Sequence, residues 1–226
     1  MTPTAPAAIL PLDATVAAAS VVCPIAGRRA LVRVLDSLLG PARVPAGRVV
    51  VVAAAGILLD VEQAVAEAGP IGASVVGCDP TASRSRCLTV GLAHLDPEPD
   101  GAILVHDHRH PLASGAVTER VLAGLASGHA VVVPALAMTD TVKETDDEGA
   151  VLQTVDRQSL RTVQYPRGYR ADVLRALLAP PDEDEFAAAV AAGHPIEMVP
   201  GDADAITAAL PADTALLEAI LGSRRG

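Results

Sequence analysis

The segment with the most unusual chemistry is residues 106–111, which reads HDHRHP and follows an apolar run at residues 103–105. A carboxylate at the end of such a strand can bind Mg²⁺, which proteins hold through one or two carboxylates together with substrate phosphates. Asp107 is therefore a candidate magnesium ligand. The three histidines occupy alternate positions and would share one side if the strand continued, so a transition-metal site is a second interpretation. A polar loop without a metal is the third, because no cysteine or glutamate with ligand spacing accompanies them.

A second candidate site is the loop at residues 79–85, which offers hydroxyl groups and Arg84 directly before a predicted helix. Helix N-termini and guanidinium groups both favour phosphate. An ordinary polar loop whose serine caps the helix is the alternative. A glycine-rich phosphate loop is missing where the first predicted strand ends, because residues 11–20 read PLDATVAAAS. Without glycine, a close approach of the backbone to phosphate is harder.

Apolar runs that alternate with helical patterns must position these two segments. The runs predict strands and the patterns between them predict helices. This alternation predicts an α/β fold with a mostly parallel sheet and helices on both faces. Ligands of such sheets bind beyond the carboxyl ends of the strands, where both candidate segments fall. The predicted strands are residues 8–10, 48–53, 73–77, 101–106 and 129–134, and the predicted helices are residues 30–39, 60–68, 86–95 and 114–127.

The alternation breaks at residues 139–163. Residues 141–143 and 151–155 predict two strands around a polar turn, so we expect a hairpin that projects from the main sheet. The alternation then resumes with helical patterns at residues 170–178, 183–192 and 212–221 and a strand at residues 196–199. A chain of 226 residues without an internal repeat is expected to form one domain, residues 1–226.

Composition excludes several classes of function. Only 1% of the residues are aromatic and the net charge is −10, so we expect no binding of nucleic acid, whether single-stranded or duplex. The three cysteines are odd in number and lack C-x-x-C spacing, which argues against a disulfide framework and a structural zinc site. No apolar run is long enough to span a membrane and no signal peptide is recognisable, so we expect a cytoplasmic protein that does not bind membranes.

Several motifs resemble those of one known family. Residues 103–111 (ILVHDHRHP) resemble VHDAARP, and residues 133–143 (VPALAMTDTVK) resemble VPxxPxxDTxK. Val155-Asp156-Arg157 followed by residues 160–168 (LRTVQYPRG) resembles xxRxxLxxxQTPQGF. These are the motifs of the 2-C-methyl-D-erythritol 4-phosphate cytidylyltransferases of the non-mevalonate isoprenoid pathway, and the resemblance covers nearly the whole chain.

The resemblance implies a Rossmann-like nucleotidyltransferase fold with a β-arm, residues 139–165, that joins two subunits into a homodimer. It also implies that the phosphate of a sugar alcohol attacks the α-phosphorus of CTP and releases pyrophosphate. In this reaction Mg²⁺ and cationic side chains stabilise the negative charge that develops in the transition state. Asp107 would hold Mg²⁺ and nucleotide, while Thr141 and Arg157 would reach the acceptor of the neighbouring subunit. The further nucleotide or substrate contacts implied are Ser83, Arg84, Cys87, His106, Arg109, His110, Lys143 and Tyr165.

The sequence departs from the family motifs at positions where those motifs have charged residues or the glycine-rich loop. Residues 11–24 are too few for the glycine-rich loop and contain no Gly, Arg or Lys, and Lys143 is the only lysine in the chain. Thr207 stands where a catalytic lysine is expected, and His110 stands where the motif has arginine. One hypothesis is a cytidylyltransferase with impaired activity or an altered nucleotide or acceptor. The other is a non-catalytic relative that keeps the fold and the dimer arm as a binding scaffold.

Overall fold

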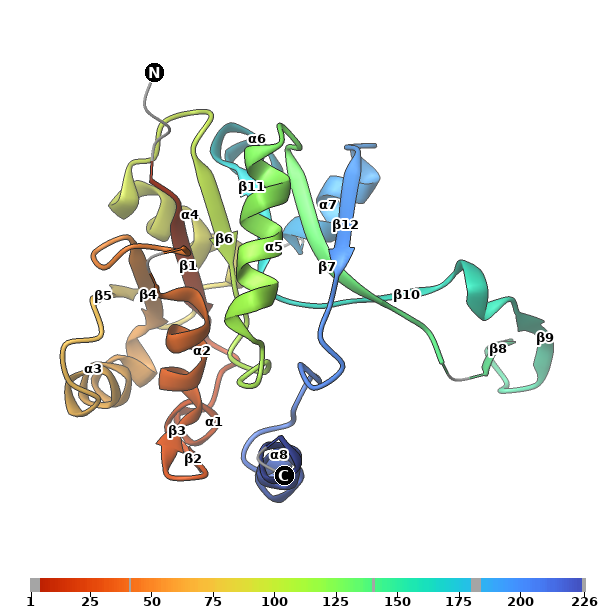
Figure 1. The fold of residues 1–226 in the computed structure, drawn as a ribbon, viewed down its shortest axis with the longest axis horizontal. Helices are drawn as coiled ribbons and strands as arrows, with labels where there is room; N and C mark the ends of the chain where they lie inside the picture. Colours follow the sequence, from red (N-terminus) through yellow and green to blue (C-terminus); the bar gives the residue numbers. More distant parts are fainter. Residues whose placement is uncertain (1–4, 41, 140, 180–183, 225–226) are drawn as a thin grey trace.

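The computed structural model describes residues 5–40, 42–139, 141–179 and 184–224, and an eight-stranded mixed sheet runs through it (Figure 1). Its strands are β1 (Ala7–Leu12), β4 (Val49–Ala54), β5 (Ala73–Cys78), β6 (Ala102–Val105), β7 (Val131–Ala137), β10 (Arg161–Val163), β11 (Arg167–Arg170) and β12 (Ile196–Pro200). Seven of them lie in the order β10-β7-β11-β6-β1-β4-β5, and β12 also pairs with β7.

The strands β6, β1, β4 and β5 are parallel neighbours and form the core of the sheet. In β1, Ile9 pairs with Val50 on one side and with Val105 on the other. Every residue of β1 and β4 is buried, as expected for strands that are covered on both faces. The predicted α/β fold with a mostly parallel sheet is therefore confirmed.

Helices cover both faces of this core. The helix α4 (Arg84–Leu95) lies on one face, where Leu88 and Leu92 share a buried cluster with Ile9. On the other face, Leu10 and Val51 share a second cluster with three helices. These helices are α2 (Ala30–Leu38), α3 (Leu58–Glu67) and α5 (Gly115–Ala126); α6 (Ala171–Leu177) and α7 (Glu185–Ala191) lie on the α4 side. The helix predicted at residues 183–192 is α7, and residue 183 lies outside the described residues.

The strand β11 was not predicted. It inserts antiparallel between β6 and β7, where Tyr169 pairs with Ile103 and with Val131. Its sequence, RGYR, has no apolar run, so local pattern gives no strand signal. Gly168 fits there because a Cβ at this position would approach Val121 Cγ1 of α5 to 2.6 Å. A close approach between helix and strand therefore selects glycine at this position.

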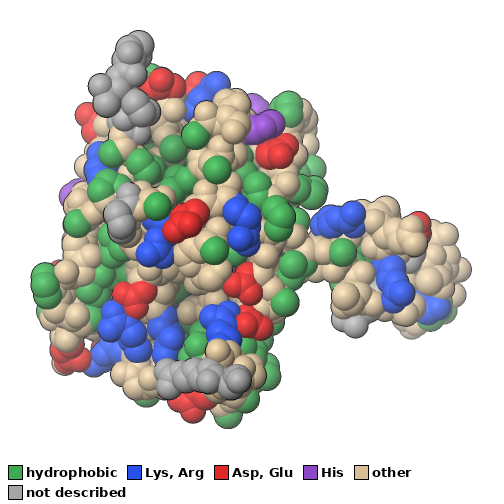
Figure 2. All heavy atoms as spheres, viewed as in Figure 1, with side chains coloured by type: hydrophobic (Ala, Val, Ile, Leu, Met, Phe, Trp, Pro, Cys, Tyr) green, Lys and Arg blue, Asp and Glu red, His purple; other side chains and the backbone are tan. Residues whose placement is uncertain are grey.

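The arm projects from the body of the molecule (Figure 1). Its tip is an antiparallel hairpin of β8 (Val142–Thr145) and β9 (Val151–Val155), and β7 and β10 form its stalk. The predicted hairpin is confirmed. Val151 and Leu152 at the tip are 62% and 61% exposed. Figure 2 shows several Lys and Arg side chains on the arm. No part of the chain that the structure describes covers these two apolar side chains.

Apart from η2 (Arg157–Ser159), which lies on the arm, the remaining elements lie at the edge of the sheet where the parallel strands end (Figure 1). They are α1 (Ala18–Val22), β2 (Pro24–Ile25), β3 (Arg28–Arg29), η1 (Ala55–Ile57) and α8 (Thr214–Ser223). The helix α8 packs through Leu217 onto Ile25 and Leu112 in a third buried cluster. No helix in the described ranges has both the length and the apolar character that crossing a membrane requires.

Candidate functional site

The segment after β6 turns at once, so its three histidines do not share one side. His106 is fully buried; its Nδ1 accepts the Asp107 N–H at 2.8 Å, and its Nε2 lies 3.4 Å from Ser37 Oγ. His110 contacts the Ala205 carbonyl through Nδ1 at 3.2 Å and Thr207 Oγ1 through Nε2 at 3.3 Å. The alternate-position argument for a transition-metal site is therefore wrong, because it required the strand to continue.

Burial keeps the three histidines of this segment neutral. It lowers the pKa of His106 to about 3, and it also lowers the pKa values of His108 and His110. His110 stands where the family motif has arginine, and it contacts Thr207, which stands where the motif has lysine. The structure thus brings these two substituted positions together as a neutral pair.

Asp107 lies on the other side of this turn, and its carboxylate pairs with the arginine two residues later in the chain. Arg109 donates from Nη2 to Oδ2 at 2.7 Å and from Nε to Oδ1 at 3.1 Å, and its backbone N–H donates to Oδ1 at 2.9 Å. Burial acts to raise the pKa of the Asp107 carboxyl, but these hydrogen bonds and the nearby Arg84 hold it well below its usual range. Asp107 is therefore an ionised carboxylate at neutral pH.

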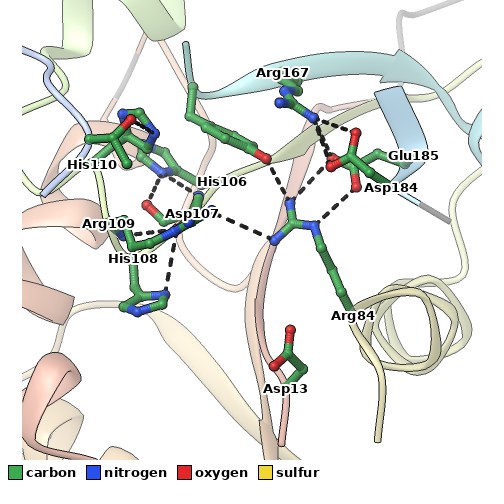
Figure 3. A network of polar contacts seen from close by, with 12 residues as sticks. Asp13, Arg84, His106, Asp107, His108, Arg109, His110, Arg167, Asp184 and Glu185 are labelled. Carbon is green, nitrogen blue, oxygen red and sulfur yellow. Dashed lines mark hydrogen bonds and ion pairs between the residues drawn. The ribbon is translucent and has the colours of Figure 1, made fainter. Parts of the chain in front are cut away.

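Arg84 approaches Asp107 from the N-terminus of α4 (Figure 3). Ser83 begins that helix as its N-cap, and its Oγ accepts the Arg86 N–H at 3.3 Å. The Arg84 guanidinium lies 3.9 Å from Asp107 Oδ2 and donates to Tyr165 Oη at 3.3 Å. The loop at residues 79–85 therefore both caps a helix and places a cation beside the carboxylate.

Glu185 holds Arg84 from the opposite side, and the sequence analysis did not identify it. Its fully buried carboxylate accepts from Arg84 Nε at 3.0 Å and from Nη2 at 3.2 Å, and it lies 3.4 Å from Arg167 Nη1. Arg167 in turn stacks on the Tyr165 ring, with its guanidinium carbon 4.2 Å from the ring centre. A signal was present, since Glu185 shares helical spacing with the buried Ala188 and Ala189.

A cavity of about 360 Å³ lies at the carboxyl ends of β1 and β6, where an open α/β sheet binds its ligands. Its charged and imidazole lining consists of Asp13, Arg84, Asp107, His108 and Arg109. A larger cavity, about 520 Å³, lies at the amino ends of the same strands and has a mainly apolar lining. The candidate site is the smaller cavity, because the predicted chemistry converges there.

The arginines around this cavity are paired with carboxylates of the protein (Figure 3). Three guanidinium groups, those of Arg84, Arg109 and Arg167, contact three carboxylates. The carboxylates are those of Asp107, Asp184 and Glu185. A phosphate group would therefore have to exchange these ion pairs for its own contacts, which weakens the attraction that the arginines can exert on an anion.

Most of the predicted contact residues gather near this cavity, whereas three of them lie on the arm. Arg157 donates to the Thr139 carbonyl at 2.7 Å, and Lys143 donates to Thr154 Oγ1 at 2.6 Å. Thr141 is exposed. The eight that gather are Ser83, Arg84, Cys87, His106, Asp107, Arg109, His110 and Tyr165.

The donor set suits Mg²⁺ when phosphate oxygens complete its coordination. Asp13 and Asp107 both line the cavity, but in the described parts of the chain no three His, Cys, Asp or Glu side chains gather as a metal site. Mg²⁺ is often held by one or two carboxylates together with substrate phosphates and water. Because Arg109 contacts both oxygens of Asp107, a metal ion would share this carboxylate with it.

Comparison with known proteins gives one consistent result. The family model for 2-C-methyl-D-erythritol 4-phosphate cytidylyltransferase matches residues 16–223. The cytidylyltransferase of Frankia casuarinae is 36% identical over 87% of this chain and 72% of its own length. That of Saccharopolyspora erythraea is 34% identical over 88% of each chain.

Solved structures give the same picture. The structure of the Thermus thermophilus cytidylyltransferase is 26% identical and aligns with a TM-score of 0.72 over 97% of this chain and 100% of its own. A 4-diphosphocytidyl-2C-methyl-D-erythritol synthase, 23% identical, aligns with a TM-score of 0.80 over 96% of this chain and 100% of its own, and shows the same fold.

Proposed function

The chain belongs to the 2-C-methyl-D-erythritol 4-phosphate cytidylyltransferase family, and from this premise we propose that its strand-end cavity binds CTP with Mg²⁺ and transfers the cytidylyl group slowly to a sugar-alcohol phosphate. The observation that carries the proposal is the convergence of Asp107, Arg84 and Arg109 on one cavity at the ends of β1 and β6. We also propose that the protein acts in the cytoplasm, as the sequence analysis predicts.

The described residues supply the binding steps of such a reaction. Asp107, which stays ionised, would hold Mg²⁺, and the metal ion would neutralise phosphate charge as pyrophosphate leaves. Arg109 is half exposed and can turn from Asp107 to a phosphate. Glu185 holds Arg84 at the cavity wall. These groups position the nucleotide, whereas His110 and Thr207, at two positions where the family motifs have a cation, are neutral and contact each other.

The missing cations are the reason to expect slow transfer. One preorganised donor to the developing charge typically contributes about 2.7–4 kcal/mol, equivalent to about 10²–10³ in rate. With Thr207 and His110 in place of two cations, the expected rate is lower by at least one such factor. The second candidate function is a non-catalytic scaffold. It is favoured by the loss of these cations together with the pairing of every arginine at the cavity to a carboxylate of the protein.

Calorimetric titration with CTP and MgCl₂ tests the nucleotide site. We expect CTP binding that requires Mg²⁺, exceeds ATP binding and weakens at least tenfold in Asp107→Asn, because the neutral amide loses the charge that holds the metal. Asp172→Asn, at an exposed ion pair with Arg170, is the matched control and should bind like the wild type. Pyrophosphate release with 2-C-methyl-D-erythritol 4-phosphate then measures turnover. CTP binding without pyrophosphate release supports the non-catalytic scaffold. No binding at millimolar CTP would contradict both CTP binding and cytidylyl transfer.

The arm gives a prediction about assembly. We propose that it forms a homodimer, in which Thr141 and Arg157 reach the partner's cavity, because its exposed apolar tip needs cover. Leu152→Glu should then shift the molar mass in sedimentation equilibrium from dimer to monomer at micromolar concentration. Leu59→Glu, at a 77% exposed leucine of α3, is the matched control. A monomeric wild type, or equal masses of both variants, would contradict the proposal.

A further inference from the structure

One wall of the candidate cavity is a loop, residues 201–210, which lies between β12 and α8 and lines the cavity through Ala208, Ala209 and Leu210. Every residue of this loop is described, and none of them lies in a helix or a strand. Buried N–H and carbonyl groups of a backbone are nearly always paired. The wall therefore keeps a fixed position only if groups from other parts of the molecule hold it.

Gln164, at the base of the arm directly after β10, holds this loop through its side-chain amide. Its Nε2 donates to the Asp202 carbonyl at 2.8 Å and to the Ala205 carbonyl at 3.0 Å, and its Oε1 accepts the Asp202 N–H at 2.9 Å. Only this orientation of the amide places its donors on carbonyls and its acceptor on an N–H. The side chain is 4% exposed, and a Cβ on Gly201 would approach its Oε1 to 2.2 Å. The loop therefore closes directly over the amide.

The segment that the amide holds also contacts residues of the candidate site. The Ala205 carbonyl, which accepts from Gln164, lies 3.2 Å from His110 Nδ1. The Ala208 N–H donates to the Arg109 carbonyl at 2.8 Å. Ala205 and Ala208 are both 1% exposed, so the loop packs closely against the segment that carries Arg109 and His110. The Gln164 amide thus fixes where this wall lies relative to the site.

We propose that Gln164 is a positioning residue for the nucleotide: it holds the loop at residues 201–210 as a wall that is formed before the nucleotide binds. This role rests on the proposed function, because it needs the cavity to bind CTP. The Gln164 N–H donates to the Pro134 carbonyl of β7 at 2.8 Å. The Gly201 N–H donates to the neighbouring Ala135 carbonyl at 3.0 Å. Loss of the amide therefore releases the loop beyond Gly201, while both anchors stay on the sheet.

Hydrogen–deuterium exchange of the full-length protein without nucleotide tests the contact itself. Gln164→Met keeps a side chain of similar length and removes the three hydrogen bonds of the amide. We expect amide exchange at residues 202–208 to become faster by about tenfold or more, while exchange in β1 and β4 stays at the wild-type rate. Gly201→Ala is a second route to the same result, since its methyl group would displace the amide from the other side.

The matched control removes a hydrogen bond of the same kind far from the cavity. Arg175 of α6 donates to the Pro97 carbonyl at 2.6 Å, in the loop that precedes β6 at the opposite edge of the sheet. Arg175→Met should lose stability in urea but keep the wild-type exchange at residues 202–208 and the wild-type affinity for CTP. This comparison separates positioning of the wall from a general loss of stability.

Calorimetric titration with CTP and MgCl₂ then tests the role in binding. We expect CTP binding to weaken by roughly tenfold in Gln164→Met and in Gly201→Ala, because a displaced wall no longer fits the nucleotide without reordering. Unchanged exchange at residues 202–208, faster exchange throughout the sheet, or wild-type CTP affinity in both loop variants would each overturn the proposal. A wild type that binds no CTP would contradict the proposed function itself, and this role with it.

Discussion

Glu185→Ala is expected to lower the free energy of unfolding by about 3–5 kcal/mol, because it leaves Arg84 and Arg167 charged without their shared buried carboxylate. Glu185→Gln should lie between this variant and the wild type, since the amide keeps one acceptor but loses the charge. Urea denaturation at pH 7 measures all three. The effect is large because the Glu185 side chain is fully buried, so its removal leaves the two guanidinium groups without their shared partner inside the protein.

The control for this prediction is an ion pair of the same chemistry at the surface. Asp172 accepts from Arg170 at 2.6 Å, but both side chains are nearly half exposed. Asp172→Ala should therefore cost less than about 1 kcal/mol. Equal losses for Asp172→Ala and Glu185→Ala would show that the Glu185 network contributes no more than a surface pair.

The second large effect is a loss of stability in mild acid that depends on His106. Because burial lowers its pKa to about 3, the folded protein keeps this ring neutral, whereas the unfolded chain binds a proton at the ordinary pKa of about 6.5. Below pH 6.5 the unfolded state therefore binds more protons, and stability falls by about 1.4 kcal/mol per pH unit. Between pH 6.5 and 4.5 we expect His106 to account for a loss of about 2–3 kcal/mol.

A single substitution separates this contribution from that of the neighbouring groups. His108 and His110 have lowered pKa values as well, so they act in the same direction, and the wild type should lose more than His106 alone explains. His106→Asn, whose amide oxygen can still accept the Asp107 N–H, should lose about 2–3 kcal/mol less over this interval. His129→Asn, at an exposed histidine, should retain the wild-type loss. Identical pH profiles for His106→Asn and the wild type would contradict the buried neutral ring.

The sequence was sufficient for those parts of the molecule whose signal is local. The β-branched run of β4 and the alternation of strands with helices predicted the parallel core, and the polar turn at residues 146–149 predicted the hairpin. Asp107 was identified because it directly follows an apolar strand, and sheet geometry alone puts such a residue at a ligand edge. Family motifs added the expectation of the fold, which the comparisons confirm.

Only the tertiary structure decided which of these groups act on one another. Glu185 holds Arg84 across 101 residues of sequence, and β11 takes its place in the sheet through pairing with β6 and β7. Periodicity reports the preference of each segment for a helix or a strand. Ion pairing and strand insertion depend instead on which segments pack together, and burial then sets the charge that each group carries.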